Sequence, residues 1–234
     1  MSSSTSPIKL VIFDMAGTII EDHGEVMSAF AGALRSNDIP FSADQLAEWK
    51  GASKRRVIRH FIERTGRPHD GELVERVHQC FRSELEEAYR KKLCPIAGAA
   101  STFAWCRERG IQLATTTGFD RDTSNLILDR TGWWHFFAAN VSSDDVASGR
   151  PAPYMIFRAI EIAGIDDVHE VANVGDTPLD LLAGWNAGVR GVIGVLTGLH
   201  TETRLRREPH THIIPSIAEL PALIEGGLSL TGGS

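Results

Sequence analysis

Three aspartates are placed to support chemistry at phosphorus: Asp14, at the end of an apolar run, and the pair Asp176 and Asp180. A carboxylate can attack a phosphorus centre and form an aspartyl-phosphate, which divides one difficult displacement into two easier ones. Because the charge of Asp14 repels an anionic phosphoryl group, a hard divalent cation with oxygen ligands is needed beside it. Asp176 is the candidate for a second carboxylate ligand, and Asp180, one helical turn further on, could ligate the cation directly or through a water.

The elements that must position these residues follow from the hydrophobic pattern. Residues 9–13 form a short apolar run rich in β-branched residues, which predicts a buried strand ending at Asp14. After Pro95, strands are expected at 111–116, near 137–141, at 171–174 and at 190–195, and helices at 99–109, 122–131, 154–163 and 180–186. This alternation predicts an α/β fold with a doubly wound, Rossmann-like parallel sheet, whose ligand site lies beyond the carboxyl ends of the strands.

A different pattern separates the first strand from the rest. Residues 24–93 carry apolar positions at helical spacing and almost no strand-like runs. We therefore expect a core domain made of residues 1–20 and 96–234, with an all-helical cap domain at 21–95. The Gly/Ser-rich tail at 229–234 is expected to be disordered.

Composition excludes several classes of function. The formal net charge is -6 and no long run of Lys or Arg occurs, so the electrostatic footprint of a nucleic-acid binder is missing. Three cysteines without metal-type spacing fit free thiols in a reducing compartment. The polar start of the sequence predicts no secretory signal, and we expect no membrane span, because no apolar run approaches the length needed. We expect a cytoplasmic protein that acts on a small molecule, with no nucleic-acid or membrane partner.

Four segments, at 14–18, 115–118, 148–151 and 175–180, fall in order where strands are expected to end. With the helical insertion after the first segment, they resemble the haloacid dehalogenase (HAD) superfamily over essentially the whole chain. The resemblance implies that the cation is Mg²⁺. It also implies that the ion is held by Asp14, Asp176, Asp180 and the backbone carbonyl of Ala16.

The same resemblance places Thr117, Gly118 and Arg150 around the phosphate. Charge on the transferring oxygens must be met by positioned donors, which a threonine hydroxyl, backbone N–H groups and a guanidinium would supply. Thr116 could take the place of Thr117, because the end of a strand is easily misplaced by one residue in a sequence-based prediction.

Ala16 decides the branch of the superfamily that the chain resembles. Phosphatases of the superfamily carry there a second Asp, which protonates the leaving group, and alanine transfers no proton. Together with Gly149-Arg150-Pro151, this residue resembles the phosphonoacetaldehyde hydrolases, which break a C–P bond. In those enzymes a cap lysine forms a Schiff base with the aldehyde, so that the departing electrons enter an enamine.

Lys54 corresponds to that lysine and could reach the core when the cap closes. Lys50 would help to lower the pKa of Lys54 if both faced the site. The resemblance has departures, since the related enzymes carry Met in place of Lys50, His in place of Val57 and Tyr in place of Phe119. Three roles therefore stay open for Lys54: Schiff-base formation, binding of substrate, or an exposed position at the start of a helix.

Three functions follow from these alternatives. The first is hydrolysis of the C–P bond of phosphonoacetaldehyde or a related carbonyl phosphonate. The second is a phosphatase for a small phosphoester, with Lys54 only binding substrate. The third is a catalytically retired binding protein, against which the presence of Asp14, Asp176 and Arg150 counts. The resemblance also suggests a homodimer formed through the caps.

Overall fold

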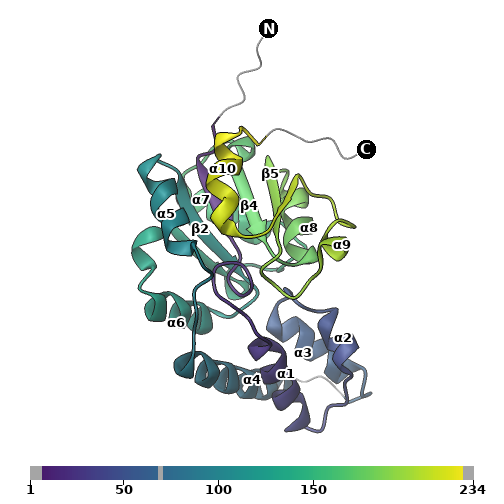
Figure 1. Cartoon of the computed structure of the whole chain (residues 1–234). Coiled ribbons are helices and arrows are strands. Elements are labelled where there is room, and N and C mark those ends of the chain that lie inside the picture. Colours follow the sequence, from purple (N-terminus) through teal and green to yellow (C-terminus); the bar gives the residue numbers. More distant parts are fainter. Residues whose placement is uncertain (1–6, 68–70, 229–234) are drawn as a thin grey trace.

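The computed structural model describes residues 7–67 and 71–228, in which a group of helices is set against one end of an α/β layer structure (Figure 1). The tail at 229–234, for which we predict disorder, lies outside the described residues. Within the described part of the chain, no helix is both long enough and apolar enough to cross a membrane.

Six parallel strands form one sheet in the order β3-β2-β1-β4-β5-β6. The strands are β1 (Leu10–Phe13), β2 (Gln112–Thr117), β3 (Ala139–Ser142), β4 (Val171–Gly175), β5 (Gly191–Val195) and β6 (His212–Ile214). The order reverses between β1 and β4, and such a reversal creates a crevice beyond the carboxyl ends of the two strands. The predicted doubly wound α/β fold is therefore confirmed.

The first strand shows how both faces of the sheet are buried. Val11 and Phe13 belong to one hydrophobic cluster, whereas Leu10 and Ile12 belong to another, because successive side chains of a strand point to opposite faces. The first face is covered by α5 (Ala99–Glu108), α6 (Arg121–Thr131) and α10 (Leu220–Glu225). The second face is covered by α7 (Tyr154–Ala163), α8 (Pro178–Ala187) and the short α9 (Glu202–Leu205).

The predicted helical insertion is present between β1 and β2. It contains α1 (Glu25–Arg35), α2 (Ala43–Ala47), α3 (Lys54–Glu63) and α4 (Gly71–Lys91). We call these helices and their connections the cap, and the rest of the described chain the core. The apolar faces of α1 and α4 pack together, with the rings of Phe30 and Phe81 4.4 Å apart between centroids. Figure 1 shows the cap below the carboxyl ends of the strands.

Two predictions about the core need correction. The segment 148–151 does not follow directly on a strand, because β3 ends at Ser142 and Arg150 comes eight residues later. A capping box between Ser142 and Asp145 turns the chain into a short 3₁₀ helix, so a loop carries Arg150 back to the sheet. The second correction concerns β6, which was not expected because its three residues are too few to show a strand period.

Candidate active site

The residues that follow the three central strands converge at the crevice. Asp14 follows β1, Asp176 follows β4, and Thr117 is the last residue of β2. These strands are neighbours in the sheet and all point the same way, so their carboxyl ends bring the three residues to one edge. Asp180 joins them from the first turn of α8, where its carboxylate accepts hydrogen bonds from the N–H and hydroxyl of Thr177 in a capping box.

Asp14, Asp176 and Asp180 form a buried carboxylate cluster in which one oxygen from each lies within 4.8 Å of the others. Among the described residues, Oδ2 of Asp176 is buried without a hydrogen-bond partner, and Oδ1 of Asp180 is buried with only an ion-pair contact to Arg150. Unpartnered buried carboxylate oxygens are costly, and a hard cation with oxygen ligands would satisfy them. The donor set therefore fits Mg²⁺ or a similar ion.

Electrostatics support the same conclusion. Burial, together with the charges of Asp14 and Asp180, raises the pKa of Asp176 well above its usual range. Burial also raises the pKa of Asp180 to about 6, with Arg150 opposing and Asp14 adding to the rise. Without a cation, protons are the means by which this cluster lowers its charge.

Arg150 is the buried cation beside the cluster. Its Nη1 donates to Oδ1 of Asp14 at 2.7 Å and lies 2.7 Å from Oδ1 of Asp180. Its Nη2 donates to the carbonyl and the hydroxyl oxygens of Thr116, at 2.7 and 2.9 Å. The guanidinium is therefore fixed by contacts on two strand ends, with one face of the fork directed at Asp14.

The two threonines at the end of β2 have different surroundings. Thr116 is occupied by Arg150, whereas Thr117 lines a cavity together with Gly118. The hydroxyl of Thr117 accepts a hydrogen bond from the N–H of Phe119 at 3.2 Å. The geometry favours Thr117 over Thr116 as the phosphate-binding candidate, because only Thr117 faces the cavity within the described structure.

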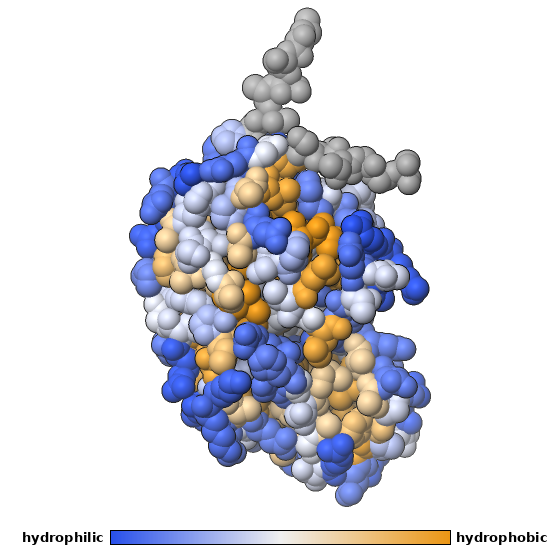
Figure 2. Space-filling view, in the orientation of Figure 1, coloured by the Kyte–Doolittle hydropathy of each residue, from blue (hydrophilic) through white to orange (hydrophobic). Residues whose placement is uncertain are grey.

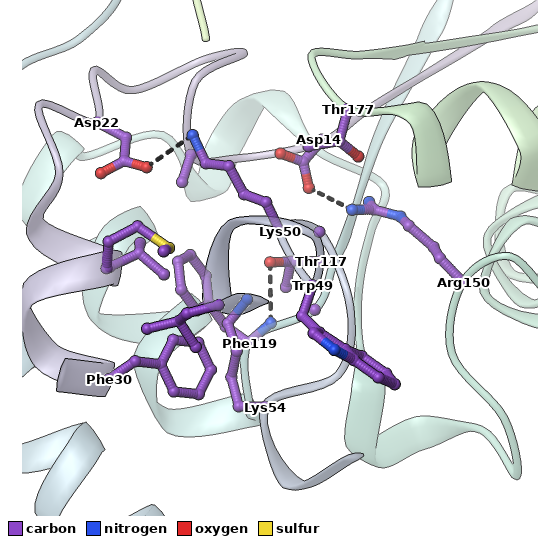
Figure 3. Close-up of a pocket in the computed structure, with 16 residues that line it drawn as sticks. Asp14, Asp22, Phe30, Trp49, Lys50, Lys54, Thr117, Phe119, Arg150 and Thr177 are labelled. Atoms are coloured by element: carbon purple, nitrogen blue, oxygen red, sulfur yellow. Dashed lines mark hydrogen bonds and ion pairs between the residues drawn. The ribbon is translucent and has the colours of Figure 1, made fainter. Parts of the chain in front are cut away.

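That cavity lies between core and cap. Its wall brings together side chains from both parts: Asp14, Thr117, Phe119 and Arg150 from the core, and Phe30, Trp49, Lys50 and Lys54 from the cap (Figure 3). Ala16 also lines it. A mixed apolar and charged wall is typical of a small-molecule site.

Lys54 reaches this cavity from the first turn of α3. The residue is only 6% exposed, its Nζ lies 4.6 Å from the centroid of the Phe119 ring, and it donates to the carbonyl of Ala52 at 3.3 Å. The exposed position considered from the sequence is therefore wrong. Burial lowers the pKa of Lys54 to about 8; the charge of Asp14 opposes this effect, whereas that of Arg150 adds to it.

The cap rests directly on the core beside the cavity. A Cβ built on Gly118 would lie 2.7 Å from the carbonyl oxygen of Ala52, and one built on Gly51 would lie 2.5 Å from the hydroxyl of Thr177. Farther out, Arg55 of the cap donates to Asp144 of the core at 2.7 Å. The conformation is thus a closed one, in which the loop before α3 lies against both strand-end loops.

A second opening lies on the side of α2 and α9, where cap and core meet. Its wall includes Glu48, Lys50, Pro178, His200 and Arg204. Figure 2 shows the molecule narrowing between core and cap at this level. Lys50 lines both this second opening and the interior cavity, so its side chain lies at the boundary between them.

One charged residue of the cavity was not found from the sequence. Asp22 lies in the connection between β1 and α1 and is buried. Its Oδ2 is 3.2 Å from Nζ of Lys50. A lone Asp in a polar connection gives no signal of burial, because its partner is far away in the sequence.

Comparisons with known proteins agree with this geometry. A family model described as haloacid dehalogenase-like hydrolase matches residues 8–188. Phosphonoacetaldehyde hydrolase from Hahella chejuensis is 30% identical, over 94% of this chain and 86% of that protein. The probable phosphatase IndB from Dickeya dadantii is 29% identical, over 95% of this chain and 96% of that protein.

A solved structure shows the same fold. The phosphonoacetaldehyde hydrolase-like protein from Oleispira antarctica superposes with a TM-score of 0.84 at 21% identity, covering 98% of this chain and 97% of that one. The family expected from the four segments is confirmed, and the chain belongs to the haloacid dehalogenase-like hydrolases.

Proposed function

We propose that this chain hydrolyses the C–P bond of phosphonoacetaldehyde or a related carbonyl phosphonate, with Asp14 as the nucleophile and Lys54 as the Schiff-base residue. The observation that carries the proposal is that a buried cap lysine with a lowered pKa lines the same cavity as Asp14 and Ala16. An amine that is partly neutral near pH 8 can attack a carbonyl, whereas an alanine cannot protonate an alkoxide.

Asp14, Asp176, Asp180 and the backbone carbonyl of Ala16 are proposed to hold Mg²⁺. When bound, the ion would reduce the repulsion between Asp14 and the phosphonate oxygens. Asp14 and Ala16 follow β1, Asp176 follows β4 and Asp180 lies in α8, and the burial of the three carboxylates supports this assignment.

The reaction starts at the carbonyl. The neutral amine of Lys54 adds to the substrate carbonyl, and loss of water gives an imine, which takes up a proton from solvent. A carboxylate oxygen of Asp14 then forms a bond to phosphorus while the C–P bond breaks. The electron pair of the C–P bond passes into the protonated imine, which becomes an enamine. Protonation of the enamine carbon and addition of water release acetaldehyde from Lys54. A second water hydrolyses the aspartyl-phosphate and frees phosphate.

The phosphonate oxygens are proposed to bind Arg150, the hydroxyl of Thr117 and the N–H of Gly118. Arg150 is held in place by Asp14, Asp180 and Thr116, so its orientation is set before substrate arrives. Such preorganised donors stabilise charge on the transferring group more effectively than mobile ones.

A phosphatase is the second candidate. The 29% identity to the probable phosphatase IndB and the presence of Asp22 and Lys50 in the cavity favour it. In that case Lys54 would bind the substrate and form no covalent bond. The leaving group would then have to be activated, since Ala16 supplies no proton.

One experiment separates the two candidates. The protein is incubated with Mg²⁺ and phosphonoacetaldehyde, phosphate and acetaldehyde are measured, and borohydride is added to trap an imine. We expect Lys54→Arg to lose both turnover and trapping, while Lys91→Arg, at an exposed cap position, keeps them. Phosphate release from monoesters by an active Lys54→Arg variant would favour the phosphatase.

A further inference from the structure

Lys50 and Asp22 form an ion pair in the wall of the cavity. Nζ of Lys50 lies 3.2 Å from Oδ2 of Asp22, and the two side chains are 7% and 0% exposed. Figure 3 shows the pair in the same cavity wall as Asp14 and Lys54. The pair is thus available to a ligand bound at those residues, although neither member takes part in the proposed bond-breaking steps.

The pair has unused hydrogen-bonding capacity. Oδ1 of Asp22 accepts from the N–H of Gly24 at 3.0 Å. Within the described structure, by contrast, Oδ2 of Asp22 and Nζ of Lys50 contact each other and have no further hydrogen-bond partner. An ammonium group has three donors and a carboxylate oxygen can accept more than one hydrogen bond, so a polar ligand atom beside the pair would use the capacity that their mutual contact leaves free.

The chemistry of the pair indicates which ligand atom that is. An ammonium group only donates and a carboxylate only accepts, so a hydroxyl group can accept from Lys50 and donate to Asp22 at once. A carboxylate on the ligand would meet the charge of Asp22, and a methyl group would leave both partners unsatisfied. The charge of the pair sums to zero, which also favours a neutral group.

We propose that Lys50 and Asp22 form a specificity site that selects substrates with a hydroxyl group next to the reacting carbonyl, namely hydroxylated carbonyl phosphonates. The inference rests on the proposed function, because it takes the phosphonate to lie at Asp14 and the carbonyl at Lys54. The pair lines the same cavity as Asp14 and Lys54, so a substrate held at those two residues lies beside it.

Three ligands that differ in one end group test the site. They are 2-oxopropylphosphonate, with a methyl group, 3-hydroxy-2-oxopropylphosphonate, with a hydroxymethyl group, and 3-phosphonopyruvate, with a carboxylate. Their affinities are measured by calorimetry with the Asp14→Asn variant, in which attack on phosphorus is blocked. We expect the hydroxyl compound to bind at least about tenfold more tightly than the methyl compound, and the carboxylate compound to bind most weakly.

The matching variant is the double replacement Asp22→Asn with Lys50→Met, made in the same background. It removes both charges together, because Lys50→Met alone would leave Asp22 buried without its partner and could prevent folding. We expect the double variant to bind the methyl and hydroxyl compounds within about twofold of each other. Lys91→Met, at an exposed position on α4, serves as the control and should keep the preference.

The outcomes separate this inference from the proposed reaction. Equal affinity for the methyl and hydroxyl compounds, or tightest binding of the carboxylate, would overturn the specificity site. If the affinity order holds but the unmodified protein releases no phosphate from any of the three, the specificity site stands and the proposed reaction fails. If phosphate is released from all three at equal rates and affinities, the reaction stands and the site fails. No binding of any ligand overturns both.

Discussion

Nζ of Lys54 lies 4.6 Å from the centroid of the Phe119 ring, so an amine of the cap rests on an aromatic ring of the core beside the strand ends. This contact exists only when the two parts meet. It places the amine in a buried environment, and burial is the main reason why the pKa of Lys54 falls to about 8. Closure of the cap and the lowering of the pKa of Lys54 are therefore coupled.

The first prediction concerns pH. At pH 7 about one tenth of Lys54 is neutral, and that fraction rises as the pH passes through 8. With Mg²⁺ saturating, kcat/KM for phosphonoacetaldehyde should rise roughly tenfold between pH 7 and 9 and then level. The groups that set this pKa are Asp14 and Asp22, which raise it, and Arg150 and Lys50, which lower it.

A steady-state profile from pH 6 to 10 measures this effect. Rapid borohydride trapping should follow the same curve, because both depend on the neutral amine. If kcat/KM is constant through this range, or rises only near pH 10, Lys54 is not the titrating nucleophile.

The second prediction concerns metal and stability. The pKa values of Asp176 and Asp180 are raised above that of an unfolded aspartate, near 3.8. The metal-free folded protein therefore holds extra protons, and their stabilising effect is lost as the pH rises from about 4 through 6. A cation replaces those protons, so its stabilising effect should grow over the same range.

Thermal unfolding with and without Mg²⁺ at pH 5 and pH 7.5 tests this. We expect Mg²⁺ to raise the Tm by several degrees more at pH 7.5, a difference of about 1–2 kcal/mol in the free energy of unfolding. Asp176→Asn should reduce the Mg²⁺-dependent rise in Tm at both pH 5 and pH 7.5. An equal increment at pH 5 and pH 7.5 in the unmodified protein would contradict the assignment of this cluster to metal binding.

The third prediction uses Ala16, which lines the cavity beside Asp14. An Asp at this position would supply the proton that an alkoxide leaving group needs, so Ala16→Asp should increase hydrolysis of glycerol phosphate by about 10²-fold. The same change adds a negative charge near the phosphonate and should lower C–P cleavage. Ala16→Asn has nearly the same size without the acid and is the control. Equal monoester activity in the two variants would show that proton supply is not what limits this reaction.

The core could be predicted from sequence because its signals are local. The apolar run before Asp14 and the periodic positions of α7 each depend on a few adjacent residues, and α7 has the predicted bounds, with Gly164 ending it in a left-handed conformation. The strand-end motifs then followed from topology, since parallel strands present their carboxyl ends together.

The remaining features depend on contacts between distant segments. The burial of Lys54 and its contact with Phe119 require the cap to lie on the core, which no periodicity reports. Asp22 and Lys50 meet across separate loops, and neither residue type in a polar stretch signals burial. Thr116 and Thr117 were left unresolved because one further residue of strand, together with the position of Arg150, decides between them.

The fourth prediction tests closure at Gly118. A Cβ there would lie 2.7 Å from the carbonyl oxygen of Ala52 and 2.9 Å from that of Gly51, and both are backbone atoms that cannot rotate away. Gly118→Ala should therefore hold the cap off the core and move Lys54 away from Asp14. A displacement of about 1 Å in a reacting group can cost 10²-fold in rate, so we expect kcat/KM to fall by at least about tenfold.

Gly149→Ala is the matched control, because a Cβ there would make one ordinary contact, 3.6 Å from Cβ of Ser53. It should leave kcat/KM within about twofold of the unmodified protein. Binding of Mg²⁺, measured through its effect on thermal unfolding, should be the same in both variants, because Gly118 contacts the cap and is not one of the three clustered carboxylates. If Gly118→Ala keeps full activity, the contact between Gly118 and Ala52 does not belong to the catalytically active state. Lys54 would then have to reach the carbonyl from another position of the cap.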